Sequence, residues 1–164
     1  PGEPARSDFS SPSRHRVGRF KAPGLETYIK IFVTGAGNEN PREMLTDAIV
    51  GFNSPRLFGT GIDHAEEFTK TLFVQFRPDE GLTRLSEKLR EASTLRSAYP
   101  LNPHLSLIYK KMSREARIQI EASVHLPFEE ACFDTVKAVI SPAEIKARGD
   151  VEAWRIAAEQ TLTT

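Results

Sequence analysis

The segment 70–77 (KTLFVQFR) carries the clearest β-strand pattern of the chain. Its side chains alternate between two faces, with Leu72, Val74 and Phe76 on one and Thr71, Phe73 and Gln75 on the other. Residues 28–34 (YIKIFVT) are β-branched and aromatic, which favours another strand. Further strands are expected at 56–62, at 103–109 and within 129–140, while residues 151–160 are compatible with a strand or a helix.

Helices are expected at 41–52 and 79–97, where apolar residues recur at helical spacing, and at 113–123. Pro41 stands in a first turn, where proline is tolerated, and Ser113 is suited to cap the third helix. The resulting order of strand, helix, strands, helix, strand, helix and strands is typical of an α+β fold and not of strict βαβ alternation.

The composition is that of one soluble globular domain, with 39% hydrophobic and 27% charged residues in a chain of 164. Basic and acidic residues both total 22, so the zero net charge excludes the overall basic footprint of duplex-DNA or polybasic membrane binders. A single cysteine excludes an internal disulfide framework and a cysteine-rich zinc site. No apolar run approaches the ~20 residues of a membrane span and no signal peptide is readable, so a soluble, cytoplasmic protein without a membrane partner is expected.

Residues 1–19 (PGEPARSDFSSPSRHRVGR) contain three prolines, four serines and four arginines, with little apolar periodicity. Such a segment cannot bury enough surface to offset its ordering entropy. We therefore expect a flexible basic arm over 1–19 and a compact domain over 20–164. The charge of the arm also suits contact with nucleic acid.

The turn Gly35-Ala36-Gly37 follows a predicted strand, as the glycines of a dinucleotide-binding fingerprint do. That fingerprint also needs a third glycine, where Asn40 stands, and an acidic residue at the end of a strand about twenty positions later. Neither is present, so the glycines are interpreted as a tight turn between a strand and a helix.

The segment 102–109 (NPHLSLIY) is the strongest candidate for chemistry. On a strand, His104 and Ser106 project from one face while Leu105 and Leu107 face the other way. A hydroxyl can donate to a phosphoryl oxygen, and an imidazole can take or deliver a proton near neutral pH without a metal. The same pattern also fits an ordinary half-buried strand with an exposed histidine.

NPHLSLIY resembles the second signature of the 2H phosphoesterase superfamily, whose members carry two His-hydrophobic-Ser/Thr-hydrophobic motifs, and is most similar to the cyclic-phosphodiesterase-like branch. FTKTLFVQF at 68–76, IFVTGAG at 31–37 and AVISPAEIKARGDVEAWRI at 138–156 extend the likeness over roughly residues 20–160. The resemblance implies a bilobal α+β fold, in which two antiparallel sheets flanked by helices surround a central cleft. It also implies hydrolysis of a cyclic phosphate by one histidine as general base and one as general acid, with no metal and no cofactor.

By the same resemblance, His104 is a catalytic acid or base and Ser106 is a phosphate ligand. Lys70 and Thr71 begin a strand that lines the cleft in the family, so Lys70 can neutralise phosphate there. Tyr109, at the end of the motif strand, can stack on a base. The alternatives are a solvated edge lysine for Lys70 and a place in the core or at its rim for Tyr109.

The first signature of the family, Pro-His-hydrophobic-Thr, is not preserved. The segment 23–26 (PGLE) aligns with 103–106 (PHLS) at an offset of 80, as an internal repeat requires. Gly24 then stands at the histidine position and Glu26 at the hydroxyl position. A carboxylate can serve as a base, which makes Glu26 a candidate substrate-site residue, although its charge repels phosphate.

His15, His64 and His125 are the remaining histidines that could replace the missing one. His15 lies in the arm, His64 in a turn between two predicted strands, and His125 in a predicted loop. For each of them an exposed structural histidine is the simpler interpretation.

The function expected from the sequence is that of a 2H-type cyclic nucleotide phosphodiesterase, a hydrolase that acts on a 2′,3′- or 1″,2″-cyclic phosphate of a nucleotide or an RNA end. Loss of one acid–base group removes a contribution of ~10²–10⁴-fold in rate, so impaired activity is expected. Two alternatives stay open: a non-catalytic nucleotide- or RNA-binding member of the same fold, and a protein-interaction module based on the basic arm.

Overall fold

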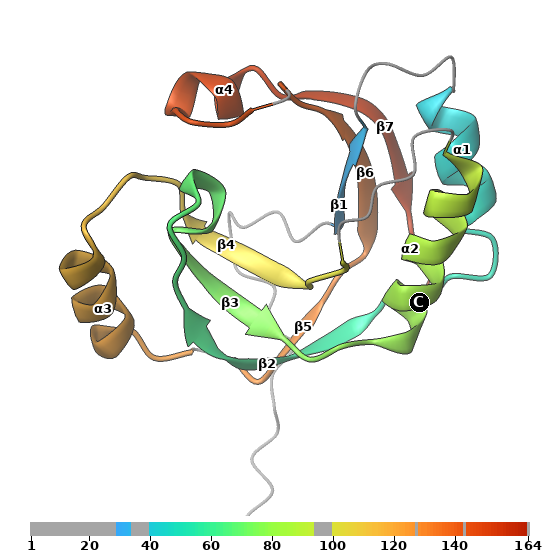
Figure 1. The fold of residues 1–164 in the computed structure, drawn as a ribbon. Coiled ribbons are helices and arrows are strands. Elements are labelled where there is room, and N and C mark those ends of the chain that lie inside the picture. Colours follow the sequence, from blue (N-terminus) through green and yellow to red (C-terminus); the bar gives the residue numbers. More distant parts are fainter. Residues whose placement is uncertain (1–28, 34–39, 94–99, 127, 143, 164) are drawn as a thin grey trace, which may run out of the picture.

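The computed structural model describes residues 29–33, 40–93, 100–126, 128–142 and 144–163 of the chain. Their strands form two sheets (Figure 1). The four-stranded sheet has the order β4 (His104–Ile108), β3 (Leu72–Phe76), β2 (Arg56–Asp63) and β5 (Glu130–Cys132). The three-stranded sheet has the order β1 (Ile29–Val33), β6 (Thr135–Ile140) and β7 (Arg155–Thr161).

The four-stranded sheet is antiparallel, whereas the three-stranded sheet is mixed and not antiparallel as expected. Every pair of the four-stranded sheet is antiparallel, and so is the pair of β6 and β7, whereas β1 runs parallel to β6. The register shifts once in each of the β2–β3 and β3–β4 pairs. Such irregularities bend a strand and increase its local twist, so the sheet is curved around β3.

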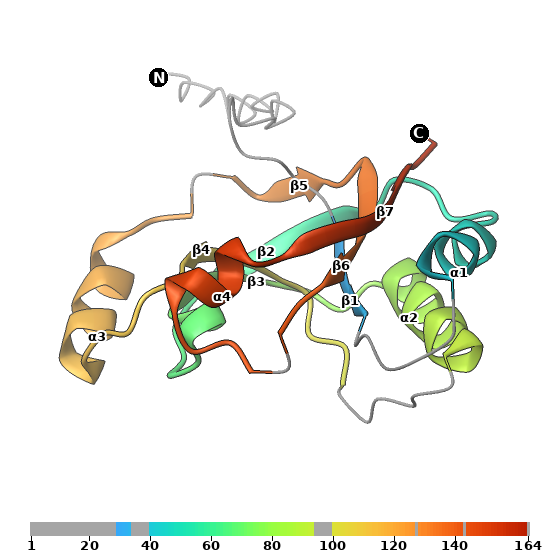
Figure 2. The same cartoon turned by 90° about the horizontal axis from the view of Figure 1, so that it is seen from above.

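The described ranges contain four α-helices: α1 (Pro41–Ala48), α2 (Glu80–Ala92), α3 (Arg114–Ser123) and α4 (Arg148–Glu152). A 3₁₀ turn, η1 (Phe68–Lys70), precedes β3. The helices α1 and α2 lie side by side at one end of the molecule, and α3 lies at the opposite end (Figures 1 and 2). No helix of these ranges is both long and apolar enough to span a bilayer.

Most predicted elements are confirmed, and with them the α+β class. Strands lie within 28–34 and 103–109 and at 56–63, and Ser113 caps α3 by accepting a hydrogen bond from the Ala116 amide at 3.2 Å. The helix predicted at 41–52 ends at Ala48, and Gly51, with a φ of 74°, turns the chain in a left-handed conformation that a helix cannot continue through. The strand predicted from Lys70 begins at Leu72, because η1 occupies the preceding residues.

Two further segments differ from their predictions. The helix expected at 79–97 is observed as α2 over 80–92, and residues 94–99 lie outside the described ranges. The segment 151–160, compatible with a strand or a helix, contains the end of α4 and most of β7.

One hydrophobic core joins the two sheets to α1 and α2. Its largest fully buried member is Phe76 of β3, whose ring lies against those of Phe133 and Phe128, with centroids 5.7 Å and 6.5 Å away. Burial of one such side chain stabilises the fold by about 1.5–3 kcal/mol. The other buried members are Leu45, Ala48, Leu57, Val74, Leu82, Leu85, Ala131, Val136, Ala138, Ala158 and Leu162.

Asp150 of α4 holds the turn that precedes this helix. Its Oδ2 accepts hydrogen bonds from the backbone amides of Lys146 (2.8 Å) and Ala147 (2.9 Å). Both bonds favour the charged form, so they lower the pKa of the Asp150 carboxyl below its ordinary value. Because α4 leads directly to Trp154 and β7, this carboxylate helps to set the path of the chain into the three-stranded sheet.

We expect a carbon-13 NMR titration to give Asp150 a pKa below that of an ordinary aspartate. The pKa is lower in the folded than in the unfolded state, so the stabilisation is complete above the unfolded pKa and is lost as the pH falls through the folded pKa. The fluorescence of Trp154, the single tryptophan, reports this local change. The acid transition is expected to be absent in Asp150→Asn, and an ordinary or raised pKa for Asp150 contradicts the prediction.

Candidate functional site

The edge strand β4 carries both candidate catalytic residues on one face. The register of β3 and β4 places His104 opposite Gln75 and Ser106 opposite Phe73. Directly opposite residues of an antiparallel pair share a face, so these four side chains lie together. Leu105, between the two candidates, packs against the hydrophobic core instead. The common face expected for His104 and Ser106 is therefore present.

The His104 ring is half-buried and contacts two neighbours among the described residues, Asn102 and Phe73. Its Nδ1 lies 2.7 Å from the backbone carbonyl oxygen of Asn102, and its ring meets that of Phe73 edge to face, with centroids 5.6 Å apart. A carbonyl oxygen can only accept a hydrogen bond, which assigns the hydrogen of this contact to Nδ1. The neutral ring is thereby fixed in the tautomer whose lone pair is on Nε2.

The Ser106 hydroxyl is bonded to the turn that precedes β3. It donates a hydrogen bond of 2.6 Å to the backbone carbonyl oxygen of Thr69 in η1. A hydroxyl has one hydrogen to donate, so donation to a phosphate requires this hydrogen to turn away from Thr69. The structure therefore places η1 beside the candidate site.

Thr71 follows η1 and is 2% exposed. Its Oγ1 lies 2.6 Å from the carbonyl oxygen of Lys110 and 3.2 Å from that of Phe68, and it accepts a bond of 3.3 Å from the Lys110 amide. These contacts tie the end of η1 to the chain just after β4. A buried hydroxyl with such partners suits bracing of the site better than direct contact with a substrate.

Lys70 and Tyr109, the other described candidates, lie near the same end of the β3–β4 pair. Lys70 is the last residue of η1 and is half-buried. Tyr109 follows β4, is 37% exposed, and meets Trp154 edge to face with ring centroids 5.9 Å apart. Because Trp154 directly precedes β7, this contact joins the two sheets beside the candidate site.

The first-signature positions Gly24 and Glu26 lie outside the described residues. So do His15 with the predicted arm at 1–19, and the turn at 35–37.

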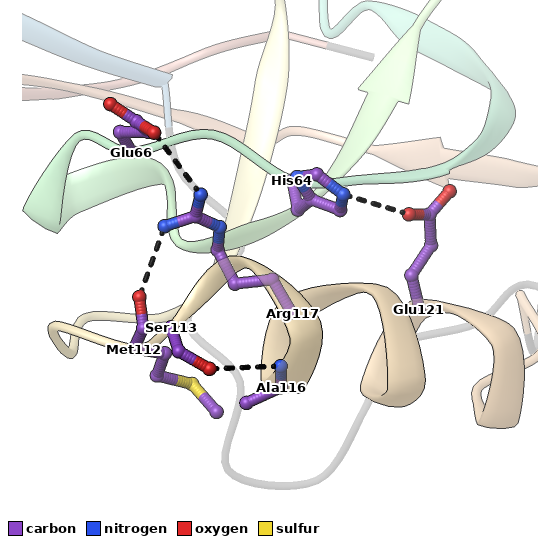
Figure 3. Close-up of polar contacts among 7 residues, drawn as sticks. All are labelled: His64, Glu66, Met112, Ser113, Ala116, Arg117 and Glu121. Atoms are coloured by element: carbon purple, nitrogen blue, oxygen red, sulfur yellow. Dashed lines mark hydrogen bonds and ion pairs between the residues drawn. The ribbon is translucent and has the colours of Figure 1, made fainter.

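His64 lies in a loop beside α3, as Figure 3 shows, and not on the face of β4. Its Nε2 is 3.3 Å from Oε2 of Glu121. One turn earlier in α3, Arg117 is 7% exposed, donates from Nη1 to the Met112 carbonyl at 3.1 Å and lies 3.5 Å from Oε1 of Glu66. These contacts of His64 and Arg117 hold the loop 64–66, which leads into η1, against α3.

Two cavities lie among the described elements, and neither is lined by His104 or Ser106. One, of about 790 Å³, is lined by α2 and the turn after α1. The other, of about 420 Å³, lies between β2 and α3 and is lined in part by His125, which is in a loop as predicted. The candidate residues His104 and Ser106 share the face of β4 instead.

Gln75 and Asn102 are neighbours of His104 to which the sequence pattern gives no role. The pattern marks Gln75 only as a polar position in a strand, and Asn102 only as part of NPHLSLIY. In the structure, Nε2 of Gln75 donates to Oδ1 of Asn102 at 2.9 Å. This contact depends on the register between two strands, which no signal within either segment specifies.

No protein-family model matches the chain, and no curated protein matches its sequence. Within the part of the chain that the structure describes, no three His, Cys, Asp or Glu side chains are grouped so that they could hold a metal ion. Function has to be inferred from the geometry of β3, β4 and η1.

We expect Thr71→Val to lower the free energy of unfolding by about 1–3 kcal/mol, because valine fills the same space but leaves the Lys110 carbonyl without the hydroxyl donor. Denaturant unfolding measures the change. Thr60→Val is the matched control, since the Thr60 hydroxyl also donates to a backbone carbonyl, that of Gln75, but at an exposed position. An equal loss of stability in the two variants contradicts the bracing role of Thr71.

Proposed function

We propose that this chain is a metal-independent, 2H-type phosphodiesterase-like protein that acts on a 2′,3′- or 1″,2″-cyclic phosphate of a nucleotide or an RNA end. The observation that carries the proposal is the face of β4, where the fixed imidazole of His104 lies on the same side as the Ser106 hydroxyl. An antiparallel sheet and a mixed sheet with flanking helices are compatible with a bilobal arrangement of that superfamily.

Proton transfer takes place at Nε2 of His104 in this proposal, because Nδ1 keeps its hydrogen on the Asn102 carbonyl. An imidazole can take a proton from an attacking water, or deliver one to a leaving oxygen, near neutral pH. The water oxygen forms a bond to phosphorus, one phosphorus–oxygen bond of the cyclic ester breaks, and the leaving oxygen ends with a proton. Hydrolysis therefore needs both a proton acceptor and a proton donor.

The other candidate residues bind the phosphate in this proposal. The Ser106 hydroxyl can exchange its bond to Thr69 for one to a phosphoryl oxygen, and Lys70 can offset negative charge nearby. Gly24 stands where the resemblance expects the second acid–base group, so one of the two proton transfers lacks its usual residue. The expected result is slow turnover.

A non-catalytic protein that binds nucleotides or RNA is the second candidate. Gly24 favours it, because one of the two proton transfers lacks its usual residue. The partly exposed ring of Tyr109 offers a surface on which a base can stack.

We expect His104→Ala to lower the turnover of 2′,3′-cyclic nucleotides, assayed in excess chelator, by about 10²–10⁴-fold, because it removes the proton-transferring group. His125→Ala is the matched control. This imidazole lies in an exposed loop that lines the cavity between β2 and α3, so its loss is expected to leave turnover unchanged. Undiminished turnover in His104→Ala removes the catalytic assignment.

Gly24→His distinguishes the enzyme from the binding protein. If the chain lacks only one acid–base group, this variant is expected to turn over cyclic nucleotides faster than the unmodified chain, by up to about 10²–10⁴-fold. Product analysis by chromatography measures the difference. A rise in melting temperature with nucleotide, but no product from either chain, supports the binding protein instead. Neither product nor a thermal shift contradicts both candidates.

A further inference from the structure

We infer that Gln75 is a positioning residue for His104 and acts on it through the turn at Asn102 and Pro103. The contacts between β3 and this turn are observed, whereas their effect on catalysis rests on the proposed function. Gln75 touches no substrate in this scheme: it fixes the direction and the tautomer of the imidazole.

The amide of Gln75 faces three hydrogen-bond acceptors. Its Nε2 lies 2.9 Å from Oδ1 of Asn102, 2.9 Å from the carbonyl oxygen of Pro103 and 3.1 Å from that of Phe76. Two of the three are backbone carbonyls, which only accept, so the amide must present its nitrogen to them. Asn102 must then present its side-chain oxygen, which fixes the orientation of both amides.

Asn102 transmits this constraint to His104. Its side chain is held by Gln75, while its backbone carbonyl accepts the bond from Nδ1 of His104 at 2.7 Å. The Pro103 carbonyl also accepts the Phe76 amide at 3.1 Å, so the turn is bonded to β3 through both a side chain and the backbone. Because the turn is held in place, the Asn102 carbonyl keeps the hydrogen on Nδ1 and the lone pair on Nε2.

The position of Gln75 in β3 supports a specific role. The other four residues of β3 are hydrophobic and buried, and Gln75 is the half-buried exception. A polar amide placed among apolar neighbours costs free energy unless its groups are bonded. Here its N–H groups have three acceptors, all of them in the turn beside His104 or in the next residue of β3.

The test is the tautomer of His104, read from long-range nitrogen-15 NMR correlations of the imidazole in the full chain. The unmodified chain is expected to show the hydrogen on Nδ1. Gln75→Leu keeps the size of the side chain but removes its donors, so the ring is expected to populate the Nε2–H form as well. Turnover of a 2′,3′-cyclic nucleotide is expected to fall by up to about 10²-fold through kcat, with KM unchanged, because only the geometry of the imidazole is altered.

Gln160→Leu is the matched control, since Gln160 lies in β7 and its amide bonds to Thr46 of α1. It is expected to leave the His104 tautomer and turnover unchanged. If Gln75→Leu does not fold, Asn102→Ala removes one of the three acceptors and is expected to give a smaller shift in the same direction.

The positioning role of Gln75 and the proposed hydrolysis can be overturned separately. An unchanged tautomer in a folded Gln75→Leu overturns the positioning role, whatever the activity. If the tautomer shifts in Gln75→Leu but the unmodified chain gives no product from cyclic nucleotides, the positioning of the ring is supported. The proposed hydrolysis is then overturned.

Discussion

The register between β3 and β4 is the constraint on which the candidate site depends. It places Gln75 and Phe73 across from His104 and Ser106, while Val74 and Leu105 pair on the opposite face, towards the core. Because side chains alternate strictly along a strand, a slip of one residue would move the imidazole and the hydroxyl to the core side. The burial of β3 opposes such a slip, because four of its five residues are buried in the observed register. The core thus fixes the register, and the register fixes the site.

Backbone carbonyls accept hydrogen bonds from three polar side chains of this site. His104 is bonded to Asn102, Ser106 to Thr69, and Thr71 to Lys110, in each case through a carbonyl oxygen. The positions of these side chains therefore follow the path of the chain through η1 and through the turn before β4. A substitution that moves either segment is expected to disturb the site even if it touches none of these three residues.

The sequence specified the local features of the fold better than the contacts between segments. Alternation predicted the common face of His104 and Ser106, and the capping preference of serine predicted where α3 begins, because both signals are contained in a few consecutive residues. The roles of Gln75 and Asn102 could not be predicted in this way, since they arise only when two strands 27 residues apart are paired in one register. The late start of β3 escaped prediction for a related reason: the bond of Thr71 to Lys110 joins η1 to a residue beyond β4.

His104 and Ser106 share a face but are anchored to different parts of the molecule. The imidazole is held by the turn before β4, which is bonded to the central strand β3. The hydroxyl is held by η1, and the loop that leads into η1 is attached to α3 through the contacts of His64 with Glu121 and of Arg117 with Glu66. Under the proposed function, proton transfer by His104 and phosphate binding by Ser106 therefore depend on different anchoring segments. Under the proposed function, a chain that lacks one acid–base group can keep the Ser106 hydroxyl for phosphate. The architecture is therefore compatible with a slow hydrolase and with a binding protein. Proton transfer at Nε2 of His104 is the step in which the two differ.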